Sequence, residues 1–258
     1  MASIGVSLGM LLGAVFPSVL ATSFLSGIFG MVGGLILMGI LLMVLPVPLA
    51  MSLHAITQMA SNGWRAFLWR AHVKWSVLPG YLAGSGAAFA LFAWIALSPP
   101  TEAVYIALGM LPFATAALPQ RWSLDIERRG APTLVGFLVM GLSVFAGVSG
   151  PALDVFFVRT ALDRRTIVAT KAMTQTLGHC LKFAYFALVI GSDPADPVLP
   201  LAVYAAAVGT AFIGTSSARI VLDRLSNQTF LRWSRRLVLG VGAAYLGRGL
   251  WLVFAHGF

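Results

Sequence analysis

The sequence predicts an all-α membrane protein, a polytopic helical bundle made of two inverted repeats. Three observations predict this fold. The chain of 258 residues is 59% hydrophobic and only 10% charged, whereas a soluble domain is about 25% charged. Apolar runs of near-spanning length recur along the whole chain. The two halves of the chain also resemble each other in their small and polar residues.

Ten apolar runs are the candidate helices. They cover residues 4–28, 33–46, 49–69, 76–97, 102–118, 131–146, 151–162, 167–190, 198–218 and 236–256. The first run lacks a basic leader segment, so we expect a retained helix and not a signal peptide. The runs 33–46 and 151–162 are short for a membrane span. Each follows a glycine break, GIFGMVGG at 27–34 and AGVSGP at 146–151, which predicts a short-helix hairpin in each half.

An internal repeat appears when Gly30 is aligned with Gly147, a shift of 117 residues. Identical residues then coincide without a gap, among them Leu25 with Leu142, Ser26 with Ser143, Gly33 with Gly150, Thr57 with Thr174 and Gln58 with Gln175. Small and polar residues rarely align by chance in so apolar a chain. We predict a first transmembrane repeat over 1–120, a cytoplasmic linker over 121–130 and a second transmembrane repeat over 131–258.

The distribution of charge predicts the orientation of the two repeats. Basic residues gather in the ranges 65–74, 121–129, 159–165 and 219–236, and the loops 98–102 and 191–197 contain none. The positive-inside rule places the basic loops in the cytoplasm. Under the repeat alignment, the basic loop near residue 70 corresponds to the acidic loop near 190, so the repeats are inverted. Inverted repeats with interrupted helices are typical of secondary transporters with a site near the membrane midplane.

A polar stripe runs through the segment ATKAMTQTLGHCLKFAYF at 169–186. Its members are Lys171, Gln175, His179 and Lys182, and the first repeat carries His54, Gln58, Asn62 and Arg65 at matching positions. A polar helix face in a bilayer should line the bundle interior or a water-filled cavity. Counting about 1.5 Å per residue places both glutamines near the centre. The same count places Lys182 near the outer side, where its amine could snorkel to the surface.

The predicted anion site combines this stripe with the two breaks. We expect Thr57, Gln58, Thr174 and Gln175 to contact the anion, with Asn62, Lys171 and His179 beside them and with the breaks formed by Gly30, Gly33, Gly34, Gly147, Ser149 and Gly150. A helix that begins after residues 33–34, or at Pro151, would aim unpaired N–H groups and a positive dipole end at the anion. The alternative reading of the threonines and glutamines is hydrogen bonding between helices.

Asp154 stands just after the second break and has two readings. The favoured one is an internal ion pair with Lys171 or Lys182. The other is a proton site, in which Asp154 and His179 load protons as an anion moves. The single cysteine, Cys180, excludes an intrachain disulfide, and its apolar surroundings predict a packed residue.

These stretches resemble a known family. The segment GIFGMVGGLILMGILLMVLPVPLAMSLHAITQ and its second copy GVSGPALDVFFVRTALDRRTIVATKAMTQ resemble the two signature repeats of the TauE/SafE sulfite exporter family. The resemblance implies a bacterial inner-membrane transporter of small sulfur-containing anions, such as sulfite or organosulfonates. Export is the implied direction, and proton coupling is a plausible accompaniment. The breaks carry fewer glycines than is usual in the family.

Two other functions stay open at the level of sequence. One is an intramembrane enzyme that uses Asp154 and His179 as acid and base, although paired catalytic motifs and nucleotide loops are lacking. The other is a passive anion channel. The expected partners are a small anion, the lipid bilayer and protons; no cofactor, metal or nucleic acid is expected, because the formal charge of +9 lies in loop clusters. The oligomeric state stays open.

Overall fold

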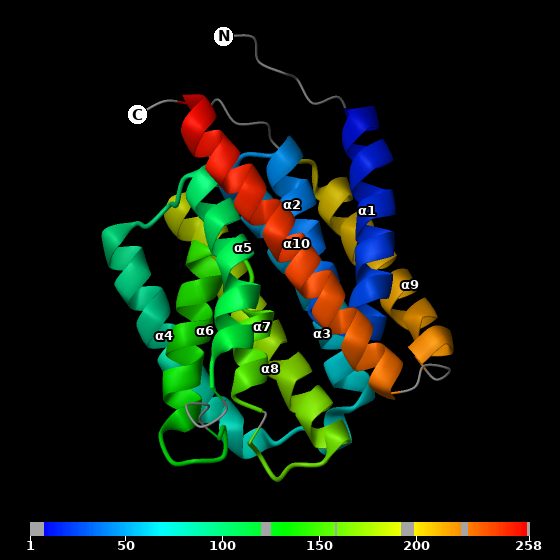
Figure 1. Ribbon diagram of the computed structural model, residues 1–258, viewed down its shortest axis with the longest axis vertical. Coiled ribbons are helices and arrows are strands. Elements are labelled where there is room, and N and C mark those ends of the chain that lie inside the picture. The colour runs from blue at the N-terminus through cyan, green and yellow to red at the C-terminus, as the bar shows by residue number, and fades with distance from the viewer. Residues whose placement is uncertain (1–7, 120–124, 158, 192–198, 223–226, 257–258) are drawn as a thin grey trace.

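The fold is a bundle of α-helices, seen in a computed structural model that describes residues 8–119, 125–157, 159–191, 199–222 and 227–256 (Figure 1). In these residues the helices are α1 (Leu8–Phe29), α2 (Val32–Val44), α3 (Val47–Leu68), α4 (Leu78–Ile95), α5 (Thr101–Ala117), α6 (Ala131–Phe145), α7 (Gly150–Val155), α8 (Arg164–Ala184), α9 (Leu201–Leu222) and α10 (Asn227–His256). Short 3₁₀ turns at Arg70–His72 and Trp75–Val77 join α3 to α4. Helix α8 continues as a π-helical turn, Tyr185–Ile190.

Each predicted apolar run coincides with one of these helices, so the all-helical fold class is confirmed. Two runs fit poorly: α7 ends at Val155 after only six residues, and α10 begins at Asn227, before the run 236–256. At 1.5 Å per residue, α2 is about 20 Å long and α7 about 9 Å. Neither could cross about 30 Å of hydrocarbon, which agrees with the expectation of short hairpin helices.

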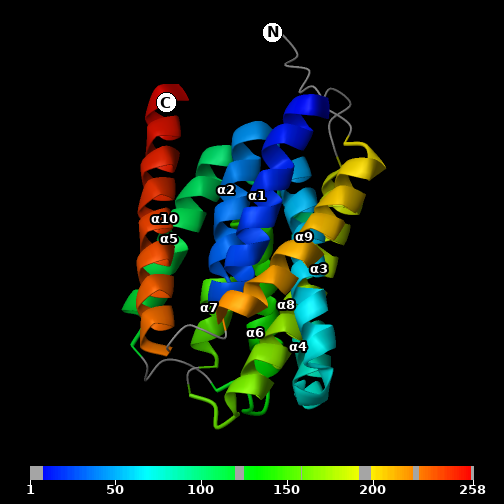
Figure 2. The ribbon, with the colours of Figure 1, turned by 90° about the vertical axis from the view of Figure 1, so that its right-hand side faces the viewer.

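Helices α3 and α8 lie side by side in the middle of the bundle, with the other helices packed around them (Figure 2). Outside this central pair, α1 packs on α9, α4 packs on α6, and α5 packs on α10. Helices α1, α3, α5 and α9 run away from the end that holds both termini, and α4, α6, α8 and α10 run back toward it (Figure 1). The central pair is therefore antiparallel.

The outer surface is that of a multi-pass membrane protein. Within the part of the chain that the structure describes, three helical segments are long and apolar enough to cross a bilayer by length and composition: Trp75–Ile95, Leu201–Ala218 and Arg232–Ala255. Large apolar side chains point outward from the bundle, and Trp94, Leu188 and Phe254 are each at least 75% exposed. Exposed apolar surface of this extent is stable against lipid and not against water.

The two glycine breaks adopt the same backbone conformation. Gly30 has φ of 69° and Gly147 has φ of 73°, in the left-handed region that glycine enters without a steric penalty. Sequence reasoning expected the first short helix to begin after residues 33–34, and this was wrong. Helix α2 begins at Val32, because the chain reverses at Gly30. Gly33 is instead needed where α2 crosses α1, since a methyl group there would lie 1.8 Å from the Thr22 carbonyl oxygen.

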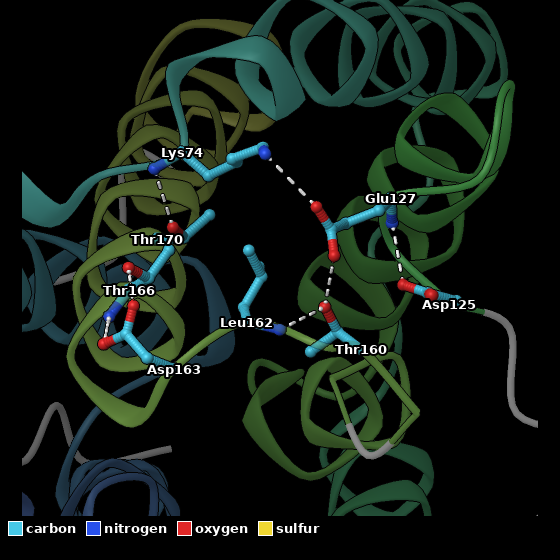
Figure 3. Close-up of polar contacts among 8 residues, drawn as sticks. All are labelled: Lys74, Asp125, Glu127, Thr160, Leu162, Asp163, Thr166 and Thr170. Carbon is cyan, nitrogen blue, oxygen red and sulfur yellow. Dashed lines mark hydrogen bonds and ion pairs between the residues drawn. The ribbon is translucent and has the colours of Figure 1, made fainter.

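Polar contacts fasten the loops at the end opposite the termini (Figure 3). The Lys74 amine lies 3.2 Å from a Glu127 carboxylate oxygen, and Thr160 Oγ1 donates to the other oxygen at 2.8 Å. The Lys74 backbone N–H donates to Thr170 Oγ1 on α8 at 2.9 Å. Three loops, those before α4, α6 and α8, are thus held together at this end of the bundle.

Asp163 caps the start of α8 in the same region. Its side chain accepts from the backbone N–H groups of Arg165 and Thr166, at 2.9 and 3.2 Å. Hydrogen bonds from Thr166 hold the pKa of this carboxyl below its ordinary value. The cap fixes where α8 begins, and so fixes the register of the polar stripe along it.

Gly147→Ala should lower the thermal stability of the detergent-solubilised protein. Alanine is strained by about 1 kcal/mol or more at positive φ, and its methyl would lie 2.8 Å from the sulfurs of Met38 and Met51. The measurement is a melting curve by fluorescence-detected size exclusion. Gly209→Ala is the control, because nothing lies within 4 Å of an added methyl there. Equal melting temperatures for the two variants would contradict the assigned break.

The Glu127 contacts should stabilise the fold only when this carboxyl is ionised. The Thr160 hydrogen bond, followed by Lys74, lowers the pKa of Glu127 from its ordinary value of 4.5. A lowered pKa stabilises the fold above the ordinary value and stops doing so as pH falls below it. We expect wild type to melt higher than Glu127→Gln at neutral pH and the gap to close below about pH 4.5. A Lys74→Gln/Glu127→Gln double variant should melt like the single variants; additive losses would contradict the pairing.

Candidate functional site

Helices α3 and α8 bring the two predicted glutamines to the middle of the bundle, each against a hairpin glycine. A methyl group added to Gly34 would lie 3.2 Å from the Gln58 amide carbon, and one added to Gly150 would lie 3.3 Å from Gln175 Nε2. The glycines therefore leave the space that the amide groups occupy. Both glutamines are held where a polar face meets a short interrupted helix.

The Gln58 amide has spare hydrogen-bonding capacity. Gln58 is buried, and its Nε2 has no hydrogen-bond partner among the described residues. Asn62 Nδ2 lies 3.5 Å from Gln58 Oε1, which is a long contact. A buried amide that lacks an acceptor costs free energy unless something supplies one. An anion oxygen would satisfy this donor.

The two predicted threonines are committed to their own helices in this conformation. Thr57 Oγ1 donates to the Leu53 carbonyl at 2.8 Å, and Thr174 Oγ1 donates to the Thr170 carbonyl at 3.0 Å. Both side chains are fully buried. Their contact with an anion stays a prediction and would require the hydroxyl groups to rotate.

The second hairpin holds Ser149 inside the protein. Its hydroxyl lies 2.8 Å from that of Ser143, and the two groups share a hydrogen bond. Helix α7 begins at Gly150 with Pro151 in its first turn, a position where proline's missing N–H is not needed. With only six residues, α7 has a weaker dipole than the sequence-based prediction of an anion-binding helix end assumed.

Lys171 and Asp154 form an ion pair between α8 and α7. Their side chains are 25% and 34% exposed, so the pair is partly buried. The favoured reading of Asp154 agrees with this contact, with Lys171 as the partner. Lys171 is therefore neutralised within the protein, and the positive charge it would offer an anion is reduced.

The prediction for the side chain of Lys182 was wrong. We expected its amine to snorkel outward, but the side chain is fully buried. Its Nζ donates to the Gly147 carbonyl at 2.8 Å and lies 3.1 Å from His54 Nδ1. The other ring nitrogen of His54, Nε2, lies 3.0 Å from the Gly34 carbonyl. Lys182 and His54 thus join the two hairpins across the central helix pair.

His179 lies next to this contact. Its ring centroid is 5.5 Å from that of His54, and its buried Nδ1 has no hydrogen-bond partner among the described residues. Arg65, which the sequence treated as a loop charge, reaches inward to donate to the Ser26 carbonyl at 3.0 Å. The repeat alignment could have signalled this, because it pairs Arg65 with Lys182 as basic residues at one position of the stripe.

A groove of about 660 Å³ lies near these residues, at the end of the bundle opposite the termini. Gly63, Ala66 and Phe67 of α3 line it with Met173 and Thr176 of α8. Thr176 follows Gln175 directly in the sequence. The groove lies at the basic end of the bundle, where Arg70 also lines it, and neither glutamine contributes to its wall. Cys180, which we expected to be packed, is exposed on the outer side of α8.

Comparison with protein-family models matches residues 15–246 to one family, described as sulfite exporter TauE/SafE. The chain belongs to the TauE/SafE family. The match covers most of the chain and confirms the resemblance that the two glycine-rich copies indicated. Comparisons with curated proteins and with solved structures gave no match.

TauE/SafE proteins are membrane transporters of sulfur-containing anions, so this chain is a transporter and not an enzyme. The hypothesis of an intramembrane enzyme with Asp154 and His179 as acid and base was wrong. For a TauE/SafE transporter, the buried amides and cations between α3 and α8 are candidate ligands of the transported anion.

Asp154→Asn should destabilise the protein because Lys171 would lose its counter-charge. Removing one member of a buried pair costs about 3–5 kcal/mol, and the partial exposure here reduces this to roughly 1–2 kcal/mol. Thermal unfolding in detergent measures the change. An Asp154→Asn/Lys171→Gln double variant should recover part of the loss, because no charge is then unpaired. If the double variant is less stable than Asp154→Asn alone, the pair has been misassigned.

Proposed function

We propose that this TauE/SafE transporter exports sulfite or an organosulfonate across the bacterial inner membrane by alternating access of two inverted repeats. The repeats span 1–120 and 131–258, joined by the linker 121–130. Exchanging α1–α5 for α6–α10 converts the packing of α1 on α9 into that of α6 on α4. In the same way, the packing of α3 on α9 becomes that of α8 on α4, and the packing of α2 on α10 becomes that of α7 on α5. This exchange of contacts supports a pseudo-twofold axis between α3 and α8.

The directions of the helices support the same proposal. Helices α1, α3 and α5 run opposite to α6, α8 and α10 (Figure 1). The described parts of the basic ranges, at the ends of α3 and α9 and before α6 and α8, lie at one end of the bundle. The positive-inside rule then places this end in the cytoplasm and both termini outside. The groove that reaches Thr176 opens at the same cytoplasmic end.

The observation that carries the proposed site is that each glutamine packs on a glycine of the short helix in its own half, Gln58 on Gly34 and Gln175 on Gly150. The two glycines differ by one position under the repeat alignment. Amide donors bind an anion without adding a buried charge, and they tolerate release because each contact is modest. Asn62, Lys171 and His179 flank them on the same stripe. Two related half-sites on antiparallel helices can present the same ligands toward either side of the membrane, as alternating access requires.

Gln58→Ala and Gln175→Ala should each lower sulfite transport in proteoliposomes. Loss of one hydrogen bond to a charged ligand costs about 1.5–3 kcal/mol, which corresponds to roughly a tenfold to hundredfold loss. Sulfite and methanesulfonate are the probes, and Thr115→Ala is the control because its hydroxyl bonds within α5. Wild-type rates in both glutamine variants would remove these residues from the site.

The passive-channel alternative is separated by counterflow. A carrier loaded inside with unlabelled sulfite takes up labelled sulfite faster, because the loaded carrier returns faster than the empty one. A channel shows no such stimulation. Export as the direction is tested by comparing sulfite efflux from right-side-out vesicles with and without the protein.

A further inference from the structure

The strongest feature that the proposed function leaves unused is the buried Lys182. It is one of three lysines in the chain, with Lys74 and Lys171. Lys74 pairs with Glu127 and Lys171 pairs with Asp154, but no carboxylate pairs with Lys182 among the described residues. A fully buried ammonium without a counter-charge is among the most costly groups a membrane interior can hold.

The neighbours of Lys182 fit a neutral amine. The Gly34 carbonyl can only accept, so His54 Nε2 carries the hydrogen and Nδ1 is left as an acceptor for Lys182. A neutral amine has two N–H groups, and the Gly147 carbonyl and His54 Nδ1 accept both of them. The next contact is Met38 Sδ at 3.9 Å, a weak acceptor. No strong acceptor is left over, among the described residues, for the third hydrogen of an ammonium.

The titratable groups that face Lys182 offer it no negative charge. They are His54 on α3 and His179 on its own helix, with Tyr81 of α4 nearby, its hydroxyl packed against Gly178. Helix α6 carries no titratable side chain, and the hairpin after it contributes the Gly147 carbonyl. A charge for Lys182 to balance must come from outside the protein.

The same cluster holds two buried polar atoms whose hydrogen bonding is unsatisfied within the described part of the chain. His179 Nδ1 and Gln58 Nε2 are both buried without partners among the described residues. Gln58 packs on Gly34, whose carbonyl holds His54, so the amide and the Lys182–His54 contact are continuous. An anion bound at Gln58 would lie beside the amine and would stabilise it as an ammonium.

We propose that Lys182 takes up one proton with each anion bound and releases it with the anion on the other side. This inference rests on the proposed function and adds a coupling ion to it. The neutral amine of the empty carrier becomes an ammonium that balances the anion. A monovalent anion and its proton then cross together without net charge, so the anion and pH gradients drive transport and the membrane potential does not.

The test compares wild type with Lys182→Arg in proteoliposomes, with sulfite as the probe at mildly acidic pH, where hydrogensulfite is the main species. Arginine stays charged and cannot carry a proton. Wild-type proteoliposomes should accumulate sulfite when the external solution is more acidic than the lumen. An imposed membrane potential should not change this accumulation. Lys182→Arg should keep counterflow, lose at least tenfold in pH-driven accumulation and respond to the potential. Lys74→Arg is the matched control, because arginine preserves the loop ion pair, and it should behave as wild type.

The outcomes separate the two proposals. If wild type shows no sulfite counterflow, the proposed function fails. If wild type shows counterflow but Lys182→Arg accumulates sulfite with the pH gradient as wild type does, the proton site is overturned. Should Lys182→Arg not fold, nitrogen NMR of the three ¹⁵Nζ-labelled lysines in wild type decides. The Lys182 signal should change from amine to ammonium when sulfite is added, and an unchanged signal overturns the proposal.

Discussion

The structure depends on one constraint: two helices with polar faces must cross the membrane interior without exposing those faces to lipid. Helices α3 and α8 meet this constraint by packing against each other in the middle of the bundle. Gly63 and Thr176 approach closely where they meet. The other described helices pack around this pair and separate its polar faces from the lipid. That division explains why the outer helices expose large apolar side chains while His54, Asn62 and Lys182 are buried.

The interrupted helices and the polar stripe form a single arrangement. Breaking a helix inside a bilayer frees backbone carbonyls that lipid cannot satisfy. Here the stripe supplies a donor at the second break, where Lys182 donates to the Gly147 carbonyl. At the first break, Arg65 adds a second donor to the Ser26 carbonyl, which also accepts from the Gly30 N–H at 2.9 Å. The stripe therefore stabilises the hairpins, and the hairpin glycines in turn make room for the stripe's amides. Neither part would be stable in the membrane without the other.

Periodicity and composition were enough to predict the helices, the short hairpins and the polar faces of α3 and α8. The sequence did not predict features that depend on contacts between helices. Counting residues placed Lys182 near the outer side, but its amine turns inward because the Gly147 carbonyl and His54 Nδ1 lie beside it. Six glycines across residues 27–34 and 147–150 could each have made a turn, and only tertiary packing separates Gly30 and Gly147 from the rest. The length of α7 was overestimated because apolarity alone does not show where a helix ends.

The distribution of interior charge is unequal between the two ends of the central pair. Toward the end opposite the start of α1, Lys171 is balanced by Asp154, a residue whose position in the first proposed repeat is held by Leu37. Toward the other end, Lys182 has only carbonyl, imidazole and thioether neighbours among the described residues. Asp154 thus departs from the repeat, and it neutralises one of the two interior lysines. In the proposed transporter, an anion that reached the interior from the end near Lys171 would pass a neutralised pair before it met Lys182. In the proposed transporter the anion would thus leave water before it came close to the Lys182 amine, which would link proton uptake to anion binding.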